Sequence, residues 1–200
     1  MAEEIKYKIA KWFLSASNWA LFFLIFILPL AIIVPSFFMP AYFLNGAHFF
    51  FAPGIALVIC EVAIYLWMWS VGNTYYKMAG FNNLFSNRVF RFFVWIPVLV
   101  SLLFLIFWIS GTSMLGMGRL SIANMLTGAL LFLIPLELLF MVGKFYCFYF
   151  TSKVIKSAEN KELAKFDDFI SEFILLLLFP IGIWFIQPRI NKLYKKLKDK

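Results

Sequence analysis

The chain of 200 residues contains few charged side chains, two cysteines and one histidine. Only 14% of its residues are charged, against about 25% in a typical soluble domain, whereas 64% are hydrophobic and the mean hydropathy is +0.89. These proportions exclude a soluble domain and indicate an all-α integral membrane protein. The net charge of +8 is assigned to loops and termini that meet anionic lipid headgroups, so nucleic acid is not an expected partner.

The scarcity of cysteine and histidine limits the chemistry that the chain can perform. Cys60 and Cys147 both lie in apolar runs and no CxxC pattern is present, so neither a disulfide framework nor a thiolate metal site is expected. The sequence contains no HExxH, GxSxG, P-loop or GxGxxG signature either. We therefore predict a protein that is not an enzyme and that uses no cofactor or metal.

Long apolar runs predict four transmembrane helices, because a bilayer requires about 20 mainly apolar residues per helix. These runs cover approximately 18–38, 49–71, 92–108 and 122–146. In the first of them, proline is expected to kink the helix at Pro29 and to end it at Pro35 and Pro40.

Basic residues alternate between successive loops, which orients the predicted helices. Lysines precede the first helix, the second loop carries Lys77, Arg88 and Arg91 without an acid, and five lysines lie over 144–165, from the end of the fourth helix onward. The intervening loops carry no basic residue or only Arg119. By the positive-inside rule, the N-terminus and the lysine-rich loops face the cytoplasm. The many Lys, Phe, Ile and Asn residues suit a low-GC bacterial genome, so we predict a multi-pass protein of the bacterial inner (cytoplasmic) membrane.

A fifth apolar segment, at about 169–186, has basic residues on both sides. A full crossing would place the dense basic cluster of 189–200 outside, against the positive-inside rule. A re-entrant hairpin would keep that cluster in the cytoplasm, and Pro180 and Gly182 offer turn geometry at its apex. We favour the hairpin, which leaves both termini cytoplasmic, and a crossing with a proline kink is the alternative.

The chain is thus predicted to have three parts. They are a four-span transmembrane bundle over 1–150, a cytoplasmic amphipathic linker over 151–168, and a re-entrant hairpin with a basic interfacial tail over 169–200. The linker runs into the hairpin through AKFDDFISEF, where phenylalanines share one face and Glu172 lies largely elsewhere.

The basic tail is predicted to begin as an amphipathic helix at Pro188 and to lie in the inner headgroup layer. Its lysines would attract anionic lipid headgroups, each contributing about 1 kcal/mol. Four residues near its start are predicted to contact the lipid interface or another membrane protein: Trp184, Gln187, Arg189 and Asn191.

The C-terminal sequence PIGIWFIQPRIN, with DDFISEF before it, resembles the C-terminus of uncharacterised bacterial small multi-pass membrane proteins. The resemblance is confined to this part of the chain. It implies no activity, and it implies that the hairpin-like ending is a recurring module.

Two acids interrupt the predicted spans. Glu61 and Glu137 lie near the middle of the second and fourth helices, where an exposed carboxylate is costly, so each should face the bundle interior. At similar depth the two could share a proton or bind a cation, with Lys144 nearby at the inner boundary. The alternative is that a protonated glutamate only forms a hydrogen bond between helices.

The predicted function is a non-enzymatic scaffold, assembly or regulatory subunit of a membrane complex. The first alternative is a small proton- or cation-coupled transporter or channel that uses Glu61 and Glu137. A lipid-handling membrane enzyme is the third possibility.

Overall fold

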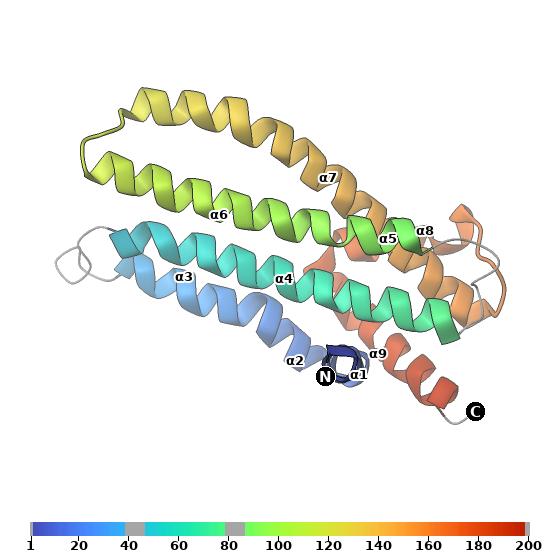
Figure 1. Cartoon of the computed structure of the whole chain (residues 1–200). Helices are drawn as coiled ribbons and strands as arrows, with labels where there is room; N and C mark the ends of the chain where they lie inside the picture. The colour runs from blue at the N-terminus through green and yellow to red at the C-terminus, as the bar shows by residue number, and fades with distance from the viewer. Residues whose placement is uncertain (1, 39–46, 79–86, 199–200) are drawn as a thin grey trace.

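A computed structural model describes residues 2–38, 47–78 and 87–198, and within these ranges the chain is helical with no strand (Figure 1). The helices in chain order are α1 (Ala2–Ser15), α2 (Asn18–Phe22), the π-helical turn η1 (Phe23–Ile27), α3 (Leu28–Phe38), α4 (Ala47–Met78), α5 (Arg88–Phe93), α6 (Trp95–Gly116), α7 (Ile122–Asn160), α8 (Phe166–Leu177) and α9 (Phe179–Lys198).

Four stretches are long and apolar enough to cross a membrane: Asn18–Pro35, Ala52–Lys77, Arg88–Met114 and Ile122–Asn160. The predicted all-α class and the four apolar spans are therefore confirmed. In Figure 1 these spans run side by side, whereas α1 is seen end-on and lies across them.

The first span differs from its prediction at the prolines. The turn η1 ends two residues before Pro29. The ring of Pro29 would crowd the carbonyl of Ile25, four residues earlier, and a π-helical turn opens the helix at that point. α3 then continues through Pro35 to Phe38, the last residue of the predicted span, so Pro35 does not interrupt the helix. Pro40 lies outside the described residues.

The long helix α7 crosses the boundary that was predicted between residues 150 and 151. It has 39 residues and ends at Asn160, where Lys161 adopts the left-handed conformation. Beyond residue 150 its buried side chains include Val154, Ile155 and Ser157. Because apolar and polar residues there keep the period of a helix, the chain has no reason to unwind. The first part of the predicted linker is thus the end of α7.

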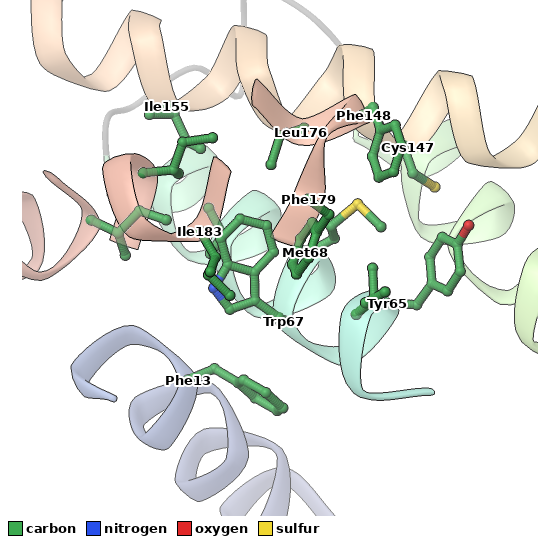
Figure 2. Packing of buried hydrophobic residues seen from close by; sticks show 14 of the residues in the cluster. Phe13, Tyr65, Trp67, Met68, Cys147, Phe148, Ile155, Leu176, Phe179 and Ile183 are labelled. Carbon is green, nitrogen blue, oxygen red and sulfur yellow. The ribbon is translucent and has the colours of Figure 1, made fainter. Parts of the chain in front are cut away.

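Buried side chains concentrate at one end of the bundle, where α1, α8 and α9 gather against α4 and α7 (Figure 2). Trp67 and Met68 of α4 are completely buried there, with Ile155 of α7 and Ile183 of α9 against them. Toward the opposite end α6 and α7 expose many apolar side chains. Such surfaces suit helices that face lipid.

The helices α8 and α9 form a tight helical hairpin. Only Leu178 separates them, with φ −93° and ψ 48°. Pro180 lies in the first turn of α9, where its missing N–H leaves no hydrogen bond unmade. The backbone N–H of Gly182 donates to the carbonyl of Leu178 at 2.8 Å, and a Cβ atom at Gly182 would lie 1.8 Å from the carbonyl oxygen of Leu175. The turn is therefore at Leu178, and glycine permits the close approach that follows it.

A second correction concerns Pro188. The sequence predicted a helix start at this residue, but Pro188 lies inside α9, which is one helix from Phe179 to Lys198. A proline in a helix interior leaves one carbonyl without its usual donor. Another helix supplies a donor to that carbonyl.

Candidate functional site

The two acids of the spans line one cavity between α4, α6 and α7. The cavity has a volume of about 530 Å³, and Glu61 and Glu137 contribute to its wall together with Ser101 of α6. Neighbouring wall residues Leu130 and Ile134 are exposed, as is Glu137, so the cavity opens along α7. The structure thus places both predicted carboxyl groups at a single site.

The carboxyl group of Glu61 lacks a hydrogen-bond partner for one of its oxygens among the residues that the structure describes. Its Oε2 atom is buried and has no hydrogen-bond partner among the described residues. The hydroxyl of Ser101 donates to the carbonyl of Pro97 at 2.9 Å, so its proton is not available to either acid. A buried polar atom without a partner is costly and often marks a place where a ligand or proton binds.

Lys144 lies beside the cavity and not in an ion pair with either acid in the described part of the chain. Its Nζ atom is 5.3 Å from the ring centroid of Phe140, which lines the cavity, and 5.9 Å from that of Phe148. These are cation–π contacts. The ammonium group therefore adds a positive charge near the carboxyl groups without neutralising one of them directly.

The rest of the cavity wall is apolar, with Leu57, Val100 and Phe104 among its residues. A volume of this size lies within the roughly 300–1,000 Å³ of pockets for small organic ligands. The described residues contain no group of three or more His, Cys, Asp or Glu that could hold a metal ion. Two carboxyl groups in an apolar wall suit a proton, or an organic cation with an apolar body, better than a tightly coordinated metal.

The four C-terminal residues singled out from the sequence bind other parts of the same chain. Gln187 is buried; its Oε1 accepts from Trp67 Nε1 at 2.8 Å, and its Nε2 donates to the carbonyls of Phe13 and Ala16 at 2.9 and 3.1 Å. Asn191 Nδ2 also donates to Ala16, at 3.0 Å. The carbonyls at the end of a helix have no partner within it, so these two amides cap α1 and fix the corner between α1 and α2.

Trp184 completes the contact with α2. Because Pro188 has no N–H, the carbonyl of Trp184 lacks its helical donor, and Asn18 Nδ2 donates to it at 3.4 Å. The ring of Trp184 also packs edge-on against Trp19, with centroids 4.7 Å apart. Asn18, the first residue of α2, thus has a specific partner 166 residues away.

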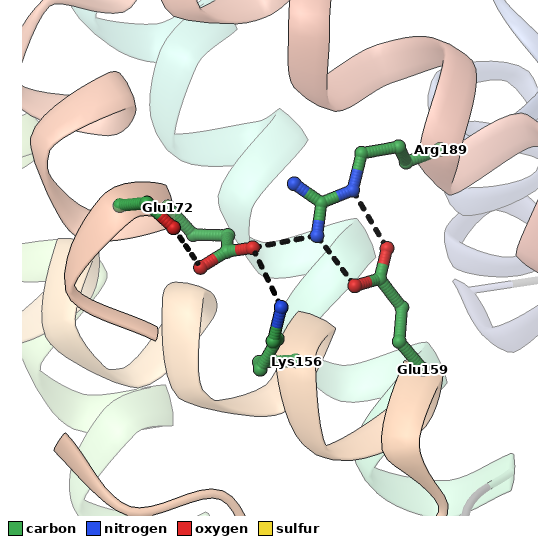
Figure 3. Close-up of polar contacts among 5 residues, drawn as sticks. Lys156, Glu159, Glu172 and Arg189 are labelled. Atoms are coloured by element: carbon green, nitrogen blue, oxygen red, sulfur yellow. Dashed lines mark hydrogen bonds and ion pairs between the residues drawn. The ribbon is translucent and has the colours of Figure 1, made fainter. Parts of the chain in front are cut away.

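Arg189 joins three helices through ion pairs (Figure 3). Its Nε and Nη2 atoms bind both carboxylate oxygens of Glu159 on α7, and Nη2 also binds Glu172 of α8 at 2.6 Å. Lys156 lies 3.5 Å from the same oxygen of Glu172, and the hydroxyl of Ser171 donates to the other oxygen at 2.9 Å. The cluster locks α8 and α9 to the end of α7.

From the sequence, we expected Glu172 to lie largely away from the apolar face of its helix. That prediction is wrong. Its side chain is only 2% exposed and lies between buried Phe169 and Leu176 on the face of α8 that meets α7. Burial alone would raise the pKa of this carboxyl group, but the hydrogen bonds from Arg189, from its own backbone and from Ser171 hold that pKa below its usual value. The carboxylate is therefore charged in the folded protein at neutral pH.

Sequence reasoning missed Lys156, Glu159 and Glu172 as partners of Arg189. One signal was present: Phe169, Glu172 and Leu176 have the spacing of one helical face. An acid on such a face needs a buried cation, and Arg189 was already a candidate.

Comparisons with known proteins add no indication of function. No protein-family model matches the chain, and no curated protein or solved structure matches it. The chemistry of the cavity is therefore the main indication of function.

Proposed function

We propose that this protein is a small multi-pass membrane transporter that binds a cation or a proton in the cavity between α4, α6 and α7. The observation that carries the proposal is that Glu61 and Glu137, from different helices, line one cavity. A charged carboxylate inside a bilayer costs several kcal/mol. Either a proton or a bound cation relieves this cost, so the two compete for the same site, and competition of this kind couples the movement of one to the other.

The apolar wall indicates the class of cation. A small hydrated ion would need several oxygen ligands in place of its water, whereas the cavity offers two carboxyl groups and mainly hydrocarbon. An organic cation with an apolar body can pack that body against the apolar wall of the cavity, out of water, and place its charge beside the two carboxyl groups. We therefore expect lipophilic organic cations, exchanged against protons, as the ligands.

Flux into proteoliposomes tests the proposal. With the dye pyranine inside the vesicles and a proton gradient imposed, ethidium added outside should change the internal pH in vesicles with the wild-type protein. Glu61→Gln and Glu137→Gln should each remove this change, because a neutral amide neither binds the cation nor releases a proton. Glu162→Gln, which alters an exposed acid outside the spans, is the matched control. A wild-type signal equal to that of empty vesicles would refute transport of this cation class.

The assembly or regulatory role expected from the sequence has less support. It depended on Trp184, Gln187, Arg189 and Asn191 as contacts for a partner. Each of these side chains makes contacts within the chain, and Gln187 is fully buried. These internal contacts favour the cavity over α9 as the place where function resides.

We further propose that both termini face the cytoplasm of a bacterial inner membrane, with the α8–α9 hairpin dipping into the inner leaflet. Large apolar side chains at the turn support this placement, since Leu178, Ile181 and Phe185 are 53–59% exposed. Hydrocarbon would cover them better than water. The lysines before α8 and those in the second half of α9 would then stay on the cytoplasmic side.

Cysteine labelling tests this topology in a background that lacks Cys60 and Cys147. A membrane-impermeant maleimide should label Arg119→Cys in intact spheroplasts and Lys195→Cys only after the membrane is opened. Both positions are exposed. Labelling of Lys195→Cys in intact spheroplasts would show a crossing in place of the hairpin.

A further inference from the structure

A second cavity lies at the basic end of the bundle, far along α4 from the one that holds Glu61. It has a volume of about 500 Å³ and is enclosed by side chains of α1, α4, α5 and α9. Four cationic residues line it, namely Lys6, Lys11, Lys77 and Arg91, against the single carboxylate of Glu3. The helix α1, which lies across the spans in Figure 1, supplies one wall.

Within the described residues, most of this positive charge is not neutralised. Glu3 is 3.0 Å from Lys6, a pair one turn apart on exposed α1. Lys11, Lys77 and Arg91 form no ion pair within the part of the chain that the structure describes. Three cations from three different helices thus point their charge at one concave site, and an anion there would relieve their mutual repulsion.

The remaining wall has two kinds of surface. Leu14, which is buried, and Trp69 provide an apolar floor. Ser70, Thr74 and Tyr194 contribute hydroxyl groups. The hydroxyl of Ser70 already donates to the carbonyl of Leu66 at 2.7 Å, so it cannot donate to a phosphate oxygen and can only accept from a hydroxyl group of the bound molecule. A site with cations, hydroxyl groups and an apolar floor matches a phosphate group attached to an apolar or glycerol body.

We propose that this cavity binds a phosphate group, carried either by an anionic phospholipid of the adjacent leaflet or by a soluble phosphate ester. Arg91 can bind two phosphate oxygens at once, and Lys11 and Lys77 act as point charges on the others. The bound group ties α1 to α4 and α5. This site is separate from the cavity of Glu61 and Glu137, so it stands or falls independently of the transport proposal.

Native mass spectrometry of the full-length protein in detergent tests the site. Apparent dissociation constants are measured for phosphatidylglycerol, phosphatidylcholine and glycerol 3-phosphate. The site variant is Lys77→Gln/Arg91→Gln, and the control is Lys161→Gln/Lys165→Gln, which removes the same charge from exposed positions between α7 and α8, outside both the cavity and the basic tail. If the site variant does not fold, the single change Lys11→Gln at an exposed position of α1 replaces it.

We expect the wild type to prefer phosphatidylglycerol to phosphatidylcholine and the site variant to bind phosphatidylglycerol about 25-fold more weakly, with the control unchanged. If instead glycerol 3-phosphate binds to the wild type and to the control but clearly more weakly to the site variant, the site is supported and its ligand is a soluble phosphate ester. Equal losses in the two variants would show general attraction to basic surface and overturn the proposal. A wild type with neither lipid preference nor glycerol 3-phosphate binding would overturn it as well.

Discussion

Replacing Arg189 by Gln is expected to lower the free energy of unfolding by about 3 kcal/mol, because it leaves a buried carboxylate without its principal cation. Glu172 is only 2% exposed at its side chain, and Arg189 also holds Glu159. We place the loss at the low end of the range for buried ion pairs since Arg189 itself is 34% exposed and Lys156 stays 3.5 Å from Glu172.

Denaturant unfolding in detergent micelles, followed by tryptophan fluorescence, measures this loss. Combining Arg189→Gln with Glu172→Gln should restore part of the stability, because the second change removes the charge that the first leaves unpaired. Lys192→Gln on the exposed face of the same helix is the control and should have little effect. Equal stability of Arg189→Gln and Lys192→Gln would contradict the role of the cluster.

The same cluster makes stability depend on pH in a defined direction. Because hydrogen bonds and charge hold the folded pKa of Glu172 below its usual value despite burial, its stabilisation is present above the unfolded pKa of about 4.3. It is lost as the pH falls from there through the folded pKa. The difference between wild type and Arg189→Gln should therefore narrow at acid pH.

Gln187→Leu alone is expected to lower the free energy of unfolding by about 3 kcal/mol. Leucine fills a similar volume but leaves the Nε1–H of buried Trp67 without an acceptor and withdraws a donor from the carbonyls of Phe13 and Ala16. Each buried group left unpaired costs about 1–3 kcal/mol. Asn191 still donates to Ala16, so the end of α1 is not fully uncapped.

A double-mutant cycle with Trp67→Phe isolates the bond between the two side chains. In a background with Trp67→Phe, no indole N–H needs an acceptor, so Gln187→Leu should cost clearly less than it does alone. Unfolding of all four proteins in the same detergent gives the coupling. Additive losses would mean that the Trp67–Gln187 bond contributes nothing of its own.

The spans and the all-α class could be predicted because composition alone determines them. Twenty apolar residues in a row are costly anywhere except in lipid or a protein core, and no knowledge of partners is needed. The prolines did not allow the path of the first span to be predicted. Neighbouring helices support its backbone, and this support determines both the π-helical turn before Pro29 and the continuation of the helix through Pro35. The predicted apex at Pro180 and Gly182 lies two to four residues after the turn at Leu178. Proline is common both in turns and in the first turn of a helix, so the sequence alone does not separate the two.

The importance of Gln187, Arg189 and Asn191 could be predicted, but their partners could not. Polar residues in an apolar segment must be satisfied somewhere, which is visible in the sequence. The partners that Gln187 and Asn191 share at the end of α1 lie up to 175 residues away, and a single sequence carries no information on such pairs. For Glu61 and Glu137, similar depth in two spans suggested a shared site, and the structure places both in one cavity.

The central claim is that Glu61 and Glu137 form one site at which a cation and a proton compete, and proton release on binding tests it most directly. Isothermal titration of the purified protein with tetraphenylphosphonium, in buffers of different ionisation enthalpy, measures the protons released per cation bound. We predict release of protons by the wild type, tighter binding as the pH rises, and loss of both in Glu61→Gln and Glu137→Gln. Binding that releases no proton and is unchanged in both variants would contradict the claim.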